Sequence, residues 1–170
     1  MATIFIEDLK IKGCEAMIVD FYVTAMKYYE VGRFKDAFDI LNTSLEDPRC
    51  LYALGTLYYN GQGVDRNFTK STEFYSLAAE AGILPAQVSA GFAYANSMGV
   101  PEDFDKAAYY LKMAVAQGEP AAKITLAEIY AKGYAGGSRK EAAVLIREVL
   151  ATTGGEEAYD VYTRYELHNA

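Results

Sequence analysis

Apolar residues in this chain recur at intervals of three and four, the spacing of an amphipathic helix, over several separate stretches. Between Cys14 and Val31 they are Met17, Ile18, Phe21, Tyr22, Ala25, Met26 and Tyr29. A second stretch begins near Arg33 and ends before Asp47 and Pro48, which interrupt a helix. Its apolar residues are Phe34, Ala37, Phe38, Leu41 and Leu45. Because only Gly32 and its neighbours separate the two stretches, the pattern predicts a hairpin of two antiparallel helices.

The stretch from Leu51 to Gly154 repeats itself three times at a period of 36 residues, the step from Gly55 to Gly91. Five sets of positions recur in this register: Leu54, Ala90 and Leu126; Gly55, Gly91 and Ala127; Tyr58, Tyr94 and Tyr130; Ala78, Ala114 and Leu150; Gly82, Gly118 and Gly154. A period of about 20–50 residues is typical of a repeat architecture. Since a single hairpin cannot bury its apolar face, the copies are expected to stack.

Small and polar residues mark where the helices of each copy cross and end. Gly55 and Gly91 fall within helices, where glycine destabilises by about 1 kcal/mol relative to alanine, so we expect a second helix to cross closely there. Paired positions that allow positive φ predict the turn inside each copy. These pairs are Gly61 and Gly63, Ser97 and Gly99, and Gly133 and Gly136. Asp103 is a natural N-cap, and Ser138 with Glu141 forms a capping-box pattern.

These motifs resemble a known repeat. The first copy carries Leu54-Gly55, Leu57-Tyr58, Gly61-Gln62-Gly63-Val64 and Ala78-Ala79; the second Ala90-Gly91, Ala93-Tyr94, Gly99-Val100 and Lys106-Ala107; the third Leu126-Ala127, Ile129-Tyr130, Gly133 and Ala142-Ala143. Residues 51–154 resemble the SEL-like (suppressor/enhancer-of-lin) repeat. Tyr28, Gly32, Phe34, Ala37 and Leu41 resemble the second half of the related tetratricopeptide repeat. The chain departs from the pattern at Ser71, at Ala127 and in the turn at residues 135–138.

The resemblance implies an all-α fold, an α-solenoid of antiparallel helical hairpins with a C-terminal capping helix. We expect a single domain over residues 1–170, composed of an N-terminal arm (1–13), a tetratricopeptide-like hairpin (14–47), three SEL-like repeats (48–82, 83–118 and 119–154) and a capping helix (155–170). The arm suits either an extended segment or a frayed helical turn. In the capping helix, Tyr159, Tyr162 and Leu167 are expected to cover the open end of the array.

Composition and charge exclude several classes of protein. The 170 residues are 52% hydrophobic, with 16 basic and 23 acidic side chains and a net charge of −7. A nucleic-acid binder needs a basic face, and this acidic chain has no run of five or six basic residues, so we expect no nucleic-acid partner. No apolar run reaches the roughly 18 residues of a membrane span. Glu7 and Asp8 stand where a signal peptide is apolar, so we expect a soluble, cytoplasmic protein with no membrane contact.

The inventory of reactive side chains indicates a protein that is not an enzyme. Cys14 and Cys50 are expected to be buried thiols, and His168 is the one histidine. The sequence offers no combination of a nucleophile, a base and an orienting group that could act together in catalysis. The glycine-rich turns lack the flanking residues of a phosphate loop. We therefore expect no catalytic residues, no cofactor and no metal site.

The resemblance also implies a binding surface, because the first helix of each hairpin lines the concave side of tetratricopeptide-type arrays. Carried onto this chain, the partner-binding positions are Tyr22, Met26, Tyr29, Tyr52, Thr56, Tyr59, Asn60, Phe92, Asn96, Glu128 and Lys132, with Glu30, Val88, Ala95, Ile124 and Ala131 also inward. Tyrosine offers a large contact area at low entropic cost. The alternative is that several of these rings pack between repeats. Asn60 and Asn96 share one repeat position, where side-chain amides can hold the backbone of an extended peptide.

The sequence thus favours a non-enzymatic module that binds a peptide or helix of another protein on its concave face. The alternative is a small acidic inhibitor or regulator that acts by covering the functional surface of a partner protein. In either case we expect a monomer or a weak homodimer.

Overall fold

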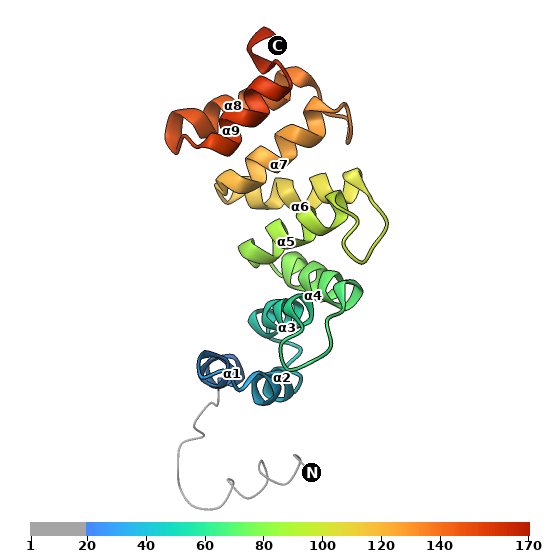
Figure 1. The fold of residues 1–170 in the computed structure, drawn as a ribbon, viewed down its shortest axis with the longest axis vertical. Helices are drawn as coiled ribbons and strands as arrows, with labels where there is room; N and C mark the ends of the chain where they lie inside the picture. The colour runs from blue at the N-terminus through green and yellow to red at the C-terminus, as the bar shows by residue number, and fades with distance from the viewer. Residues whose placement is uncertain (1–19) are drawn as a thin grey trace, which may run out of the picture.

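The computed structural model describes residues 20–170, and within that range it contains nine α-helices, one short 3₁₀ helix and no strand (Figure 1). The helices are α1 (Phe21–Glu30), α2 (Phe34–Leu41), α3 (Pro48–Asn60), α4 (Phe68–Glu80), α5 (Leu84–Ala95), α6 (Phe104–Ala116), α7 (Pro120–Ala131), α8 (Arg139–Thr152) and α9 (Glu156–Arg164), followed by the 3₁₀ helix η2 (Leu167–Asn169). The predicted all-α architecture is confirmed. The expected arm, the start of the first predicted helix and Cys14 lie outside the described residues.

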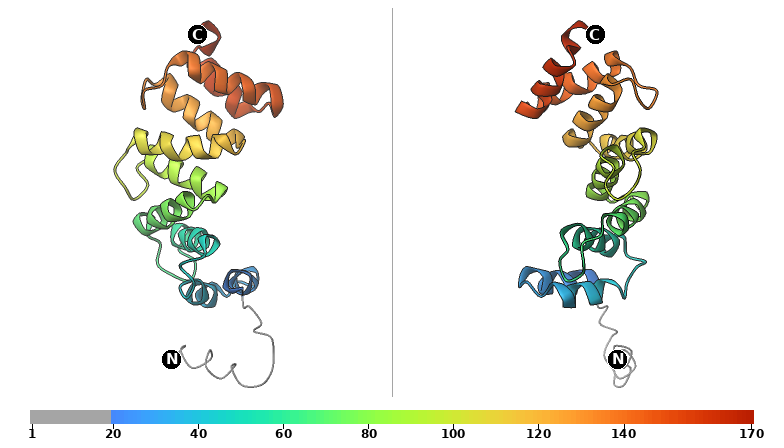
Figure 2. Two further views of the ribbon diagram at one scale, coloured as in Figure 1. Left: turned by 180° about the vertical axis from the view of Figure 1, so that it is seen from behind. Right: turned by 45° about the vertical axis from the view of Figure 1, so that its right-hand side comes forward.

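The helices pair into hairpins that stack in chain order into an elongated array, with α1 and α2 at one end and α8 and α9 at the other (Figures 1 and 2). The helices α3, α5, α7 and α9 begin at Pro48, Leu84, Pro120 and Glu156, so each begins one full period after the last. The helix α9 contacts both α7 and α8. It therefore occupies the position of a first helix of a further hairpin.

Side chains at the start of the helices satisfy the backbone N–H groups that lack a partner within the helix. The carboxylates of Asp47 and Asp103 accept hydrogen bonds from Arg49 N and Lys106 N. Ser138 and Glu141 form the expected capping box at α8. Such caps contribute about 1 kcal/mol each, and they define where each helix of the array begins.

The two helices of each hairpin cross where the sequence has glycine. A Cβ atom at Gly55 would lie 2.6 Å from Cδ1 of Tyr75, and one at Gly91 would lie 2.6 Å from Cγ of Leu111. The predicted close crossing is therefore confirmed at both positions. The buried hydroxyl of Ser71 donates to the carbonyl of Gly55 at 2.8 Å. This bond explains why a serine is accommodated at a position where the repeat usually has alanine.

Successive hairpins are joined by contacts between a turn and the preceding second helix. A Cβ atom at Gly99 would lie 2.3 Å from the backbone of Phe68 and of Thr69, and Thr69 Oγ1 donates to the carbonyl of Gly99 at 2.7 Å. In the third copy the rings of Tyr134 and Phe104 stack at 4.2 Å instead. The turns therefore set the spacing of the hairpins as well as reversing the chain.

The predicted end of the second helix is wrong. The helix α2 ends at Leu41 rather than just before Asp47, and the side chain of Leu45 is 47% exposed. The side chain of Asn42 donates to the carbonyl of Phe38, and the hydroxyl of Thr43 donates to the carbonyl of Ile40. The carbonyl of Ile40, which a longer helix would pair with the N–H of Ser44, is taken by Thr43 instead, so the chain turns there.

Two details of the third copy and the last helix also differ from expectation. The connection inside the third copy spans residues 132–138, one residue fewer than residues 96–103 in the second. Val149, rather than Leu150, is therefore the buried counterpart of Ala114. Leu167 is fully buried and Tyr162 packs against the same core, as expected, but α9 also makes this contact through Ala158 and Val161, and Tyr159 is 61% exposed.

Candidate binding surface

Two of the exposed aromatic side chains expected on the concave face line one cavity of about 370 Å³, here called the main hollow because both rings lie at it. Two cavities elsewhere are somewhat larger, at about 380 and 460 Å³. Tyr59 and Phe92 are 40% and 48% exposed at the main hollow. The remaining lining residues come from α4, α5, α7, α9 and the turn after α5, and they are Phe68, Ser71, Thr72, Tyr75, Val88, Ser89, Ala93, Met98, Ala121, Thr125 and Glu157. The hollow therefore extends along the array across three repeats and the last helix.

The hydroxyl groups in the wall of the main hollow are used within the protein. Ser71 donates to Gly55 as described, and Thr72 Oγ1 donates to the carbonyl of Met98 at 2.8 Å. Burial raises the pKa of Tyr75, so its hydroxyl remains a neutral donor, 3.4 Å from Thr56 Oγ1. A ligand would therefore meet mainly aromatic and aliphatic surface in this hollow.

The predicted residues of α1 and the first half of α3 line a second, smaller hollow of about 170 Å³. Its wall comprises Tyr22, Met26, Tyr29, Tyr52, Ala53 and Thr56. The hydroxyl of Tyr29 donates to Gln62 Oε1 at 3.1 Å, and Asn60 Nδ2 donates to the same oxygen at 3.1 Å. The structure thus brings five predicted positions together and links a sixth, Asn60, to them through Gln62.

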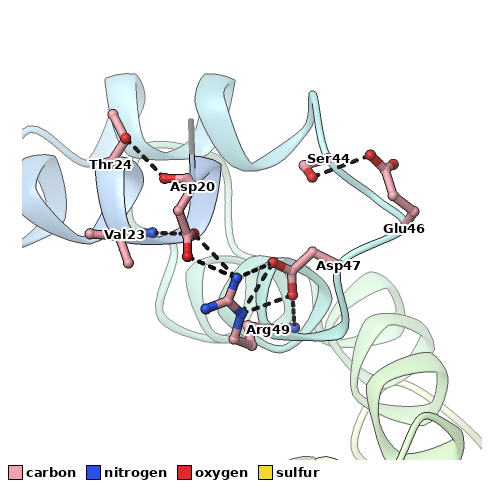
Figure 3. Close-up of polar contacts among 7 residues, drawn as sticks. All are labelled: Asp20, Val23, Thr24, Ser44, Glu46, Asp47 and Arg49. Atoms are coloured by element: carbon pink, nitrogen blue, oxygen red, sulfur yellow. Dashed lines mark hydrogen bonds and ion pairs between the residues drawn. The ribbon is translucent and has the colours of Figure 1, made fainter. Parts of the chain in front are cut away.

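An arginine that sequence reasoning missed holds α1 to the start of α3 beside this smaller hollow (Figure 3). The guanidinium of Arg49 pairs with Asp47 at 2.7 Å and with Asp20 at 3.1 Å, and it lies 4.9 Å above the ring of Tyr22. The hydrogen bond from Arg49 lowers the pKa of Asp47, while that of Asp20 is lowered chiefly by the backbone N–H of Val23. Asp20 and Asp47 are recognisable as N-caps, but no sequence pattern pairs them through Arg49.

At the other end of the predicted surface, Glu128 and Lys132 are engaged with the protein itself. Glu128 Oε1 accepts a hydrogen bond from the hydroxyl of Tyr165 at 3.1 Å, and it pairs with Lys132 at 3.3 Å and Arg164 at 3.5 Å. The neighbouring inward position, Ile124, is buried. The contacts come from α9 and the residue after it, so the inner side of α7 is partly covered. A role for Glu128 and Lys132 in partner binding stays a prediction.

The two asparagines at equivalent repeat positions do not point their amides at a common site. Asn96 Nδ2 donates to the carbonyl of Phe92 at 2.9 Å, whereas Asn60 donates to Gln62. Both side chains are exposed. Holding a peptide backbone would therefore require each amide to exchange its present acceptor for one on the ligand.

Other reactive groups in the described part of the chain are few. Cys50 is a fully buried free thiol, and burial raises its pKa to about 11. Among residues 20–170, no three His, Cys, Asp or Glu side chains lie together in a way that could hold a metal ion. None of the helices described is long and apolar enough to cross a membrane.

Comparisons with known proteins agree with the repeat pattern. The family model described as Sel1 repeat matches residues 48–83 and 84–119. A Sel1 repeat protein from Oxalobacter formigenes has a similar structure, with a TM-score of 0.73 and 23% identity over 88% of this chain and 61% of that one. No curated protein sequence matches significantly.

A second similar structure is c5321, a protective antigen present in uropathogenic Escherichia coli strains and displaying an SLR fold. Its TM-score is 0.71 with 20% identity, over 88% of this chain and 38% of that one. This chain therefore spans less than two thirds of the length of either solved structure. At these identities the similarity shows a shared fold.

Proposed function

We propose that this chain, whose residues 48–119 match two Sel1 repeats, is a SEL-like repeat protein whose first-helix face binds a peptide or helix of a partner protein. Repeats of this type are generally modules for protein–protein interaction and generally scaffolds rather than enzymes. The finer proposal concerns which surface is used. It places the partner at the main hollow and along α1, α3 and α5.

The observation that carries this proposal is the pair of exposed rings at the main hollow. Phe92 and Tyr59 leave about half of their side chains in solvent beside an apolar cavity of about 370 Å³. Exposed apolar surface that is both contiguous and concave is typical of a binding site. Aromatic residues are also enriched among the side chains that supply most of the binding energy at protein interfaces.

The test is partner capture with the double variant Tyr59→Ala, Phe92→Ala. If each ring contributes about 2 kcal/mol or more, losing both should weaken binding by roughly a thousandfold. The measurement is affinity capture from the native lysate, followed by titration of the captured partner. Thermal melting of both proteins should show that the fold survives.

The matched control removes two exposed rings elsewhere, in Tyr109→Ala with Tyr159→Ala. Tyr109 is 51% exposed on the second helix α6, and Tyr159 is 61% exposed on α9, and neither lines the main hollow. The control should capture the partner normally. Loss of capture by the control, with retention by the first variant, would place the binding surface outside the main hollow.

A second candidate is an acidic regulator that covers the functional surface of a partner, for which the net charge of −7 is the supporting observation. Binding of that kind is steered by charge and weakens as ionic strength rises. Binding by the aromatic surface depends less on salt. Measuring the affinity at several salt concentrations therefore separates the two candidates.

A further inference from the structure

One side chain in the wall of the main hollow carries a charge. Glu157 lines the cavity from the first turn of α9; it is exposed, and its carboxylate has no ion-pair or hydrogen-bond partner among residues 20–170. Lys123 pairs with Glu148 at 2.8 Å, and Lys132 and Arg164 pair with Glu128, so these three cations are engaged with other carboxylates. The carboxylate of Glu157 is therefore left to interact with a ligand.

The rest of the wall also suits a positive charge. Four aromatic rings line the hollow, those of Tyr59, Phe68, Tyr75 and Phe92. The faces of such rings attract cations, most strongly where water is excluded. Arg66, which is not part of the wall, already places its guanidinium 5.3 Å from the centre of the Phe68 ring.

We propose that the main hollow receives a lysine or arginine side chain of the partner segment, flanked by a large apolar residue. The apolar residue and the methylene stem lie among the rings, and the charged end pairs with Glu157. This inference rests on the proposed function and adds to it the chemistry of the partner. The net charge of −7 favours a basic segment over an acidic one at long range.

The position of Glu157 also has a purely structural explanation, which the test must distinguish from a role in binding. Glu156 and Glu157 both lie in the first turn of α9, where a negative charge interacts favourably with the positive end of the helix dipole. Glu156 does not line the hollow. The variant Glu156→Gln therefore removes the same helix-terminal charge as Glu157→Gln but leaves the hollow unchanged.

The experiment selects binders from a random library of dodecapeptides displayed on phage, against the wild-type protein, Glu157→Gln, Glu156→Gln and Phe92→Ala. Wild type and Glu156→Gln should enrich peptides with lysine or arginine next to a large apolar residue. Individual synthetic peptides should bind Glu157→Gln on the order of tenfold more weakly than wild type. Glu157→Lys should reverse the preference toward acidic peptides.

The outcomes distinguish this inference from the function on which it rests. Peptides that need Phe92 but show no preference for a basic residue, or that bind Glu157→Gln as tightly as wild type, overturn the inference and leave the proposed function intact. Equal losses for Glu156→Gln and Glu157→Gln also overturn it, because they indicate an effect on α9 alone. Enrichment of peptides that bind Phe92→Ala as tightly as wild type overturns both.

Discussion

At the scale of the residue, a few glycines determine how closely the parts of the array approach. Gly55 and Gly91 allow the two helices of a hairpin to cross with side chains of the partner helix directly against the backbone. Gly63 and Gly99 allow a turn to rest on the first turn of the preceding second helix, with positive φ values of 72° in both cases. Substitution at either kind of site meets atoms that cannot easily move.

We predict that Gly99→Ala destabilises the protein more than Gly82→Ala. Both glycines have positive φ, so alanine should lower the free energy of unfolding by about 1–2 kcal/mol at each. At Gly99 the new methyl group would also collide with the backbone of Phe68 and Thr69, whereas at Gly82 it would meet nothing within 4 Å. Urea denaturation gives both values. Equal losses would mean that the turn does not rest on α4 in solution.

The places of some residues could be predicted from the sequence, and those of others could not. The register of the repeat placed Tyr59 and Phe92 on one side, and the structure puts both in the wall of one cavity. The same register made Leu150 the equivalent of Ala114, whereas the buried equivalent is Val149, because the turn of the third copy is one residue shorter than that of the second. The pairing of Arg49 with Asp20 could not be predicted, since contacts between side chains far apart in the sequence leave no local pattern.

At the scale of the element, α9 is a first helix without the usual turn and second helix after it in the described chain. Its place is fixed by the buried side chains of Ala158 and Val161 and by Leu167 in η2. Arg147 on α8 donates to the carbonyl of Leu167 at 3.2 Å. The C-terminal residues were expected to cover the third repeat, but the sequence did not indicate that α9 would also reach the inner side of α7.

We predict that Ala158→Glu lowers the free energy of unfolding by about 2 kcal/mol or more, because it places an unpaired charge in a fully buried site. The matched control is Tyr159→Glu on the exposed side of the same helix, which should change stability by at most about 0.5 kcal/mol. Thermal and urea unfolding measure both. Similar stability of the two variants would contradict the docking of α9 described here.

At the scale of the whole molecule, nearly all of the fold could be predicted from the 36-residue period. Two helices per period and stacking of the copies follow from the burial requirement of a single hairpin. How much of the inner surface stays uncovered could not be predicted from the sequence, because it depends on where α9 packs. Seven of the eight partner-binding positions predicted on α1, α3 and α5 line the two hollows, the exception being Asn60, whereas at α7 the side chains of Glu128 and Lys132 pair within the protein.

Both faces of the molecule carry a hollow, because a cavity of about 460 Å³ is lined mainly by residues of α4, but its rings, Tyr94 and Tyr110, are less exposed than Tyr59 and Phe92. The first-helix face carries the main hollow with its exposed rings and the carboxylate of Glu157. The second helices also expose single aromatic residues, such as Tyr109, but its hydroxyl already donates to Glu80 at 3.1 Å. The central claim is that a partner protein occupies the first of these faces.

Site-specific photocrosslinking tests that claim most directly. Benzoylphenylalanine is introduced in place of Phe92 on α5 or, as the control, in place of Tyr109 on α6, two aromatic positions of similar exposure. After irradiation in the native lysate, the probe at position 92 should form a covalent adduct with the partner, and the probe at position 109 should not. Adducts from position 109 with none from position 92 would contradict the account.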